Sequence, residues 1–148
     1  MNKPVLNILA IDDDFSCLLA YARFITLVGG HKVETAKNGE TGVRKAAELR
    51  PDIILLDMCM PGMNGLEVMD ALCAAPATRE IPVILITGGE LTEGELARLK
   101  SRRNFMLVEY KPASMGKLLA TIEAALRPPP QYAQRESGDA GADLAQEG

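Results

Sequence analysis

Short aliphatic runs that alternate with helix-like segments constrain the fold of this chain more than any other feature. The runs are typical of buried strands and cover 6–11, 32–36, 52–56, 82–86 and 105–110. Segments with helical spacing of apolar residues separate and follow them, over 15–28, 40–49, 66–75, 92–103 and 114–126. This strict alternation predicts an α/β fold, a doubly wound five-stranded parallel sheet with five helices.

Local signals mark where several of these elements begin or end. Asp14 or a neighbour can cap the helix over 15–28, and the glycine pair at 29–30 ends it. The dipeptide Asn38-Gly39 is predicted to form a turn before the next helix. His31, the single histidine of the chain, follows the glycine pair and is expected to be exposed and without a function.

Length and charge limit the classes of protein to which the chain can belong. Its 148 residues suffice for one sizeable core and are too few for two ordinary domains. A formal net charge of −4 argues against direct nucleic-acid binding. No apolar run approaches the ~20 residues of a membrane span, and the first residues lack a signal-peptide pattern. We therefore expect neither membrane insertion nor nucleic-acid binding.

The cysteines and the C-terminal composition lead to two further expectations. Cys17, Cys59 and Cys73 are scattered, odd in number and without CxxC spacing, which suggests a reducing cytoplasm and no disulfide framework. Three prolines at 128–130 end the regular pattern, and Gly, Ala and acids are frequent after them. We expect one domain over 1–127 and a disordered tail, first Pro-rich and then acidic, over 128–148.

Four of the expected strands lead into residues suited to phosphate chemistry. These residues are Asp12 and Asp13, Asp57, Thr87 and Lys111. Because ligands bind beyond the carboxyl ends of the strands in an open parallel sheet, one pocket would collect their side chains. Neighbouring carboxylates repel each other unless a cation joins them, and Mg²⁺ prefers such oxygen ligands. Taken alone, the first acids could be a polar turn that caps a helix, but an acid directly after a buried strand at Asp57 favours the site.

Four short motifs occur in an order that resembles a known family. They are Asp12-Asp13, the loop Asp57-Met-Cys-Met-Pro-Gly-Met-Asn-Gly65, Thr87-Gly88 and Lys111-Pro112. Each motif alone is weak, whereas the ordered set is specific. The set resembles the receiver (CheY-like) domain of two-component response regulators over about residues 5–126. The resemblance implies the flavodoxin-like fold of that family.

The resemblance also implies a Mg²⁺ site. In it Asp13 and Asp57 ligate the ion together with the backbone carbonyl oxygen of Cys59, and Asp12 acts mainly through a bound water. The thiol of Cys59 has no part in this arrangement. The expected cofactor is therefore Mg²⁺.

Three residues receive roles in phosphoryl transfer from the same resemblance. Asp57 is the phosphoryl acceptor, which attacks a phosphohistidine on a sensor kinase. Lys111 pairs with the acceptor carboxylate and then with the phosphoryl oxygens, while Thr87 turns its hydroxyl toward the phosphoryl group. Pro112 is expected to be cis, as in the family. A carboxylate nucleophile beside Mg²⁺ and an ammonium group suits this chemistry on physical grounds as well.

The function that follows is that of a cytoplasmic, single-domain response regulator. It would receive its phosphoryl group from a sensor histidine kinase or a phosphotransfer protein. It would then signal to a downstream protein by contact, or pass the phosphoryl group on. Its only catalysis would be its own phosphorylation and dephosphorylation, so it is not expected to be an enzyme in the usual sense.

Two alternatives come from other classes. Receivers usually place an aromatic residue three positions before the lysine, where this chain has Val108, and Tyr110 could take its place. That departure favours a pseudo-receiver, a binding module without phosphorylation, although no acid and no lysine of the motifs is lost. A phosphohydrolase of the haloacid-dehalogenase type would need an acid two residues after Asp57, where Cys59 stands.

Overall fold

The computed structural model describes residues 3–111 and 114–126 of the chain. The predicted tail over 128–148 and the predicted cis residue Pro112 lie outside the described residues. Within the described part, no helix is both long and apolar enough to cross a membrane.

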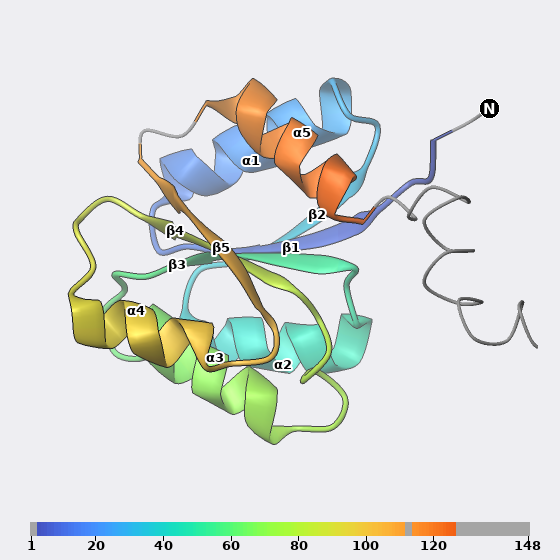
Figure 1. Cartoon of the computed structure of the whole chain (residues 1–148). Helices are drawn as coiled ribbons and strands as arrows, with labels where there is room; N and C mark the ends of the chain where they lie inside the picture. Colours follow the sequence, from blue (N-terminus) through green and yellow to red (C-terminus); the bar gives the residue numbers. More distant parts are fainter. Residues whose placement is uncertain (1–2, 112–113, 127–148) are drawn as a thin grey trace, which may run out of the picture.

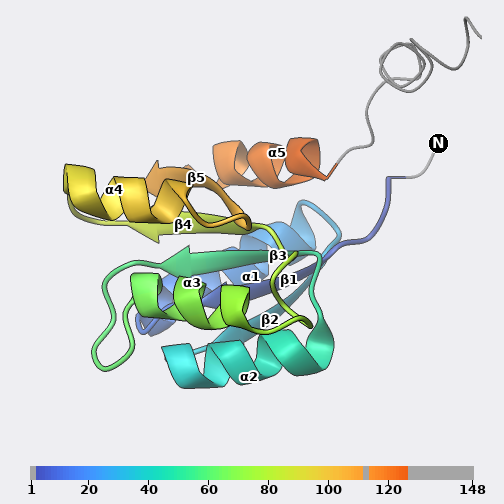
Figure 2. The same ribbon diagram turned by 60° about the horizontal axis from the view of Figure 1, so that its bottom comes forward.

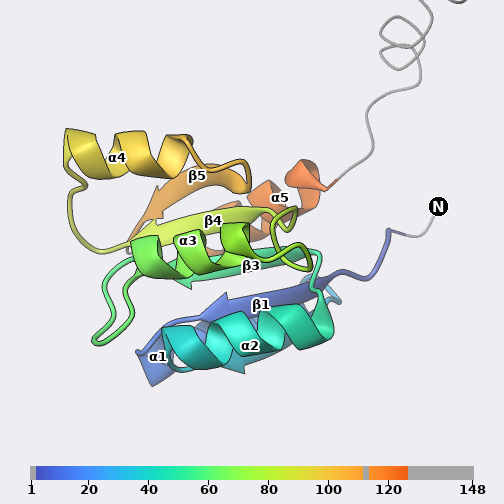
Figure 3. The same cartoon turned by 90° about the horizontal axis from the view of Figure 1, so that it is seen from below.

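The strands form one parallel sheet in the order β2-β1-β3-β4-β5, and helices cover both of its faces (Figure 1). The strands are β1 (Asn7–Ile11), β2 (Lys32–Ala36), β3 (Ile53–Asp57), β4 (Val83–Thr87) and β5 (Phe105–Tyr110). The helices are α1 (Phe15–Leu27), α2 (Gly39–Leu49), α3 (Gly65–Ala74), α4 (Glu93–Lys100) and α5 (Met115–Ala125). One face carries α1 and α5, and the other carries α2, α3 and α4, which lie in front in Figure 3. The predicted doubly wound, five-stranded parallel sheet with five helices is confirmed.

Two apolar cores, one on each face of the sheet, hold the helices in place. The central strands β3 and β4 are buried at every position because helices cover both faces. Ile54 and Leu56 belong to the core with α2, α3 and α4, whereas Ile53 and Leu55 belong to the core with α1 and α5. Burying one such side chain stabilises the fold by roughly 1.5–3 kcal/mol. The central strands therefore form a rigid support for whatever lies at their carboxyl ends.

The predicted turn at Asn38-Gly39 is wrong in one respect, because Asn38 caps α2 and Gly39 is the first residue of that helix. The Asn38 side chain accepts a hydrogen bond from the Thr41 N–H at 2.8 Å, which satisfies a free donor at the helix start. A Cβ at Gly39 would lie 2.8 Å from Val68 and 2.9 Å from Met63. Glycine therefore allows the start of α2 to pack closely against α3 and the loop before it.

The helix α4 is shorter than the predicted helix over 92–103. The Thr92 side chain caps its first turn, and the helix ends at Lys100. A turn follows, in which the Phe105 N–H donates to the Arg102 carbonyl oxygen at 3.1 Å. The helical spacing of the sequence continues past Lys100, but the chain must reverse there to enter β5.

His31 is buried, at 2% exposed, so the expectation of an exposed residue is wrong. Its Nδ1 accepts a hydrogen bond from the Leu6 N–H at 3.1 Å, and its Nε2 lies 2.7 Å from Glu123 Oε2. Because Nδ1 accepts, Nε2 carries the proton and donates to Glu123. The ring therefore connects the residue before β1 to α5, a contact between segments that are distant in the sequence.

Replacing His31 by alanine is expected to lower the free energy of unfolding by about 1–3 kcal/mol, because the Leu6 N–H loses its acceptor inside the protein. Urea denaturation measures the change. Lys3→Ala is the matched control, since it removes only the solvent-exposed ion pair between Lys3 Nζ and Glu123 Oε2 at 2.8 Å, which contributes little. Equal losses in the two variants would contradict the role given to His31.

Candidate functional site at the carboxyl edge of the sheet

The carboxyl ends of the strands meet at one edge of the sheet, on the side to which the arrowheads point in Figure 2. Asp12 directly follows β1, Asp57 ends β3, Thr87 ends β4, and Lys111 directly follows β5. These four strands are consecutive neighbours in the sheet. The structure therefore brings the residues singled out in the sequence to the same edge.

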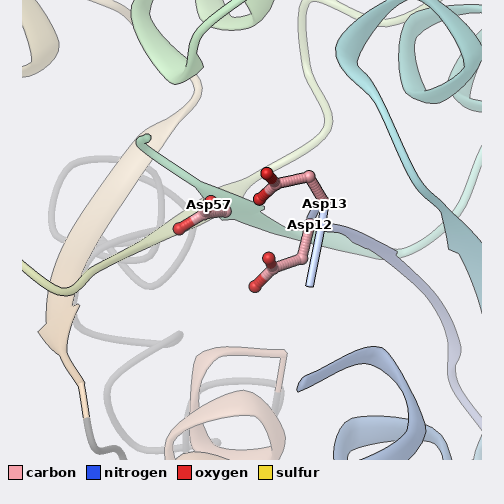
Figure 4. A group of neighbouring side chains, drawn as sticks. All are labelled: Asp12, Asp13 and Asp57. Atoms are coloured by element: carbon pink, nitrogen blue, oxygen red, sulfur yellow. The ribbon is translucent and has the colours of Figure 1, made fainter. Parts of the chain in front are cut away.

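Three carboxylates lie together at this edge (Figure 4). One oxygen atom each of Asp12, Asp13 and Asp57 lies within 4.8 Å of the other two. Asp12 and Asp57 are buried, at 1% and 4% exposed, while Asp13 is exposed to solvent. Mg²⁺ is commonly held by one or two carboxylates together with waters and phosphate oxygens, and this donor set fits that preference.

The ammonium group of Lys111 joins the two buried acids. Its Nζ lies 3.1 Å from Asp12 Oδ2 and 3.2 Å from Asp57 Oδ1. The other oxygen of Asp12, Oδ1, accepts a hydrogen bond from the Asp14 N–H at 2.9 Å. Asp14 itself caps α1, as predicted. The sequence reasoning missed the contact between Lys111 and Asp12, which no motif spacing indicates because it depends on how the strands are ordered.

The surroundings of Asp57 and Lys111 shift the pKa values of both groups upward. Burial raises the pKa of Asp57 to about 6, and the charge of Asp12 acts in the same direction, while Lys111 opposes it. Burial alone would lower the pKa of Lys111, but its hydrogen bond to Asp12 and the charges of both acids raise it overall. Lys111 is therefore cationic at neutral pH and supplies the counter-charge to the buried carboxylates.

The raised pKa of Asp57 predicts a pH effect on the stability of the metal-free protein. An aspartate ordinarily ionises near 3.8, as in the unfolded chain, whereas Asp57 in the folded protein ionises near 6. At a pH above the folded pKa, Asp57 is ionised in both states, and its burial as a carboxylate lowers the free energy of unfolding by on the order of 1–3 kcal/mol. At a pH below the unfolded pKa, the group is protonated in both states and this loss of stability disappears.

Urea unfolding in EDTA, with wild type and Asp57→Asn compared at each pH, measures this effect. Asparagine does not titrate, so the stability of wild type relative to the variant is expected to fall between about pH 4 and about pH 7. A difference that stays constant over this range would contradict the raised pKa of Asp57.

The hydroxyl of Thr87 is bonded to the loop that follows β4. The Thr87 side chain is buried, and its Oγ1 accepts from the Gly89 N–H at 3.2 Å and donates to the Gly89 carbonyl oxygen at 3.3 Å. The Thr87 carbonyl oxygen accepts from the Lys111 N–H at 2.8 Å, which fastens the ends of β4 and β5 together. The structure thus places Thr87 at the site edge with its hydroxyl turned to the loop.

The loop after β3 carries Cys59, two residues after Asp57. Cys59 is exposed, while Met58 and Met60 on either side are buried and anchor the loop in the core. The Gly65 N–H donates to the Met58 carbonyl oxygen at 2.9 Å and closes the loop. A Cβ at Gly65 would lie 2.8 Å from Met58 Cα and 3.0 Å from the carbonyl oxygen of Asp57. Gly65 therefore shapes the site, a role that the sequence reasoning missed although this glycine ends the loop motif.

The end of β5 shows how the departure at Val108 is accommodated. Val108 packs against the core on the side of α2, α3 and α4. Tyr110 is 56% exposed and lies in register with Thr87 on the neighbouring strand. The structure therefore places Tyr110 on the surface beside the end of β4, outside both cores.

The fold and the site together define a class, small doubly wound α/β domains with a cluster of carboxylates and a lysine at the carboxyl edge of the sheet. Comparison with known families shows to which family within this class the chain belongs. The family described as the response regulator receiver domain matches residues 8–123, and the chain belongs to this family. The resemblance inferred from the four motifs is thereby confirmed.

Individual relatives agree with this assignment. The transcriptional regulatory protein PrrA of Mycobacterium leprae is 34% identical over 121 residues, which cover 82% of this chain and 50% of PrrA. Protein PilH of Pseudomonas aeruginosa is 36% identical over 98 residues, 66% of this chain and 78% of PilH. The structure of the chemotaxis protein CheY4 of Vibrio cholerae superposes with a TM-score of 0.75 at 27% identity, covering 83% of this chain and all of CheY4. The chain spans about half the length of curated relatives such as PrrA.

Family membership has general consequences for the chain. Receiver domains are signalling domains of two-component systems, and their partners are histidine kinases or phosphotransfer proteins. They bind Mg²⁺ at an acidic pocket, and the cluster of Asp12, Asp13 and Asp57 has that composition.

Proposed function

We propose that this chain is a single-domain response regulator, with its receiver domain over 1–127, and that it accepts a phosphoryl group on Asp57 in a Mg²⁺-dependent reaction. The observation that carries the proposal is the position of Asp57, a buried carboxylate within 4.8 Å of two further acids and 3.2 Å from the Lys111 ammonium. A sensor histidine kinase or a phosphotransfer protein is the donor. The output is contact with a downstream protein or onward transfer of the phosphoryl group.

The geometry supports a nucleophilic role for Asp57. A carboxylate oxygen of Asp57 attacks the phosphorus of a phosphohistidine, the phosphorus–nitrogen bond breaks, and an aspartyl phosphate forms. Lys111, already 3.2 Å from Asp57 Oδ1, neutralises charge on the phosphoryl oxygens during transfer. Thr87 exchanges its bonds to Gly89 for one to the phosphoryl group, since its hydroxyl lies at the same edge.

Asp12, Asp13 and Asp57, with the backbone carbonyl of Cys59, are the residues that would hold Mg²⁺. The bound ion supplies positive charge against the phosphoryl oxygens. Asp12 also orients Lys111 through its 3.1 Å contact, so this acid serves both the cation site and the lysine.

Incubation of the full chain with acetyl phosphate, with and without Mg²⁺, tests the proposal by intact-mass analysis. We expect a gain of one phosphoryl group that requires Mg²⁺ and that peptide mapping assigns to Asp57. Acetyl phosphate needs no partner protein, so this labelling is measured on the purified chain alone. A chain that stays unlabelled both by acetyl phosphate and by a cognate histidine kinase would be a pseudo-receiver, and the proposal would be wrong.

A further inference from the structure

A groove of about 390 Å³ lies between α1 and α2, beside the end of the edge strand β2. Figure 2 shows β2 between these two helices. None of the acids of the candidate site, nor Thr87 or Lys111, lines the groove. The groove is therefore separate from the carboxyl-edge site. Its volume falls within the range of about 300–1,000 Å³ that small-molecule sites occupy.

One wall of the groove is apolar and is left open to solvent. Helix α1 contributes Phe15, Leu18, Leu19 and Ala22 to this wall. Phe15 is 67% exposed and Leu19 is 39% exposed, so two large apolar side chains at the groove are uncovered. Burying such surface against a ligand is favourable because it removes apolar area from water.

The opposite wall is polar and cationic. Lys37 and Lys45 line it together with Thr35, Asn38 and Thr41, and no carboxylate is among the lining residues. Lys45 Nζ lies 2.9 Å from Glu34 Oε2 and donates to the Thr35 carbonyl oxygen at 2.7 Å. The carboxylate of Glu34 therefore neutralises part of the charge of Lys45. Within the described part of the chain, Lys37 is exposed and takes part in no ion pair.

The charge of this wall contrasts with that of the whole protein, which has a formal net charge of −4. The first turn of α2 begins at the same wall and includes the exposed Glu40, which does not line the groove, so the unpaired positive charge of the wall is that of Lys37. An anionic group is therefore favoured at this end of the groove, and an apolar body is favoured along α1.

We propose that this groove binds a small amphipathic organic anion, a carboxylate attached to an aryl or alkyl body. The apolar body lies against Phe15 and Leu19, and the carboxylate faces Lys37. The groove shares no lining residue with the cluster of Asp12, Asp13 and Asp57, so a ligand bound there does not displace any of these carboxylates.

Nuclear magnetic resonance titration of the full ¹⁵N-labelled chain tests the proposal with two matched probes, phenylbutyrate and phenylbutanamide. The probes share an apolar body and differ in charge. We expect saturable shifts confined to backbone amides at the groove, with tighter binding of phenylbutyrate. Shifts that do not saturate, that scatter over the surface, or that show equal affinity for the two probes would overturn the proposal.

Three variants separate the two walls. Lys37→Gln is expected to weaken phenylbutyrate binding by about 3-fold and to leave phenylbutanamide binding unchanged, the size expected for an exposed ion pair. Leu19→Ser is expected to weaken the binding of both probes. Lys32→Gln is the control, since Lys32 is exposed at the start of β2, the strand that Lys37 directly follows, but does not line the groove. Equal effects of Lys37→Gln and Lys32→Gln on phenylbutyrate would overturn the assignment of the cationic wall.

Discussion

Replacing Asp57 by asparagine is expected to abolish Mg²⁺-dependent phosphorylation and to leave the fold intact. The asparagine amide is not a nucleophile toward phosphorus and cannot form the acyl phosphate. The side chain keeps nearly the same volume inside a buried position, at 4% exposed, so the surrounding packing is retained. Intact-mass analysis after incubation with acetyl phosphate and Mg²⁺ measures the phosphorylation, and circular dichroism measures the fold.

Asp14→Asn is the matched control for this experiment. Asp14 follows the acid cluster in the sequence but is not one of its three carboxylates. Asparagine caps helices about as well as aspartate, so the bonds from the Ser16 and Cys17 N–H groups are kept. We expect Asp14→Asn to be labelled like wild type. An Asp57→Asn chain that is labelled to wild-type stoichiometry would refute the proposed function.

Gly65→Ala is expected to damage both the stability and the site, because its Cβ would meet backbone rather than a flexible side chain. The nearest atoms are Met58 Cα at 2.8 Å and the Asp57 carbonyl oxygen at 3.0 Å. The loop after β3 must shift to make room, which costs about 1–3 kcal/mol. The shift also moves Asp57, so we expect slower labelling by acetyl phosphate as well as a lower urea midpoint.

Gly116→Ala provides the comparison for Gly65→Ala. Gly116 lies in α5, and nothing lies within 4 Å of a Cβ built there. Alanine is the better helix former, so this variant is expected to gain about 0.5 kcal/mol and to be labelled at the wild-type rate. If Gly65→Ala behaved like Gly116→Ala, the close approach at Gly65 would have no functional consequence.

The sequence alone determined the class of fold and which residues meet at the candidate site. Strands and helices have different spacings of apolar residues, so the alternation of the two patterns indicates βα units without reference to distant contacts. A parallel sheet collects the carboxyl ends of its strands at one edge. For this reason Asp12, Asp57, Thr87 and Lys111, each at or just after the end of a strand, could be predicted to lie together.

Features that depend on a distant partner could not be predicted in this way. His31 follows a glycine pair, which is typical of an exposed turn, yet its ring is buried between Leu6 and Glu123. Lys111 was expected to pair with Asp57, and the structure shows a second contact with Asp12, from which it is separated by 99 residues. The cap at Asn38 and the end of α4 likewise depend on what the neighbouring segments allow.

The tertiary structure decided these features because it alone sets which segments are neighbours. The order β2-β1-β3-β4-β5 and the packing of α1 beside α5 bring Leu6, His31 and Glu123 together. Local spacing specifies whether a side chain faces a core, since helices and strands have fixed periods. It does not specify which residue lies opposite that side chain, because that choice depends on contacts between segments far apart in the chain.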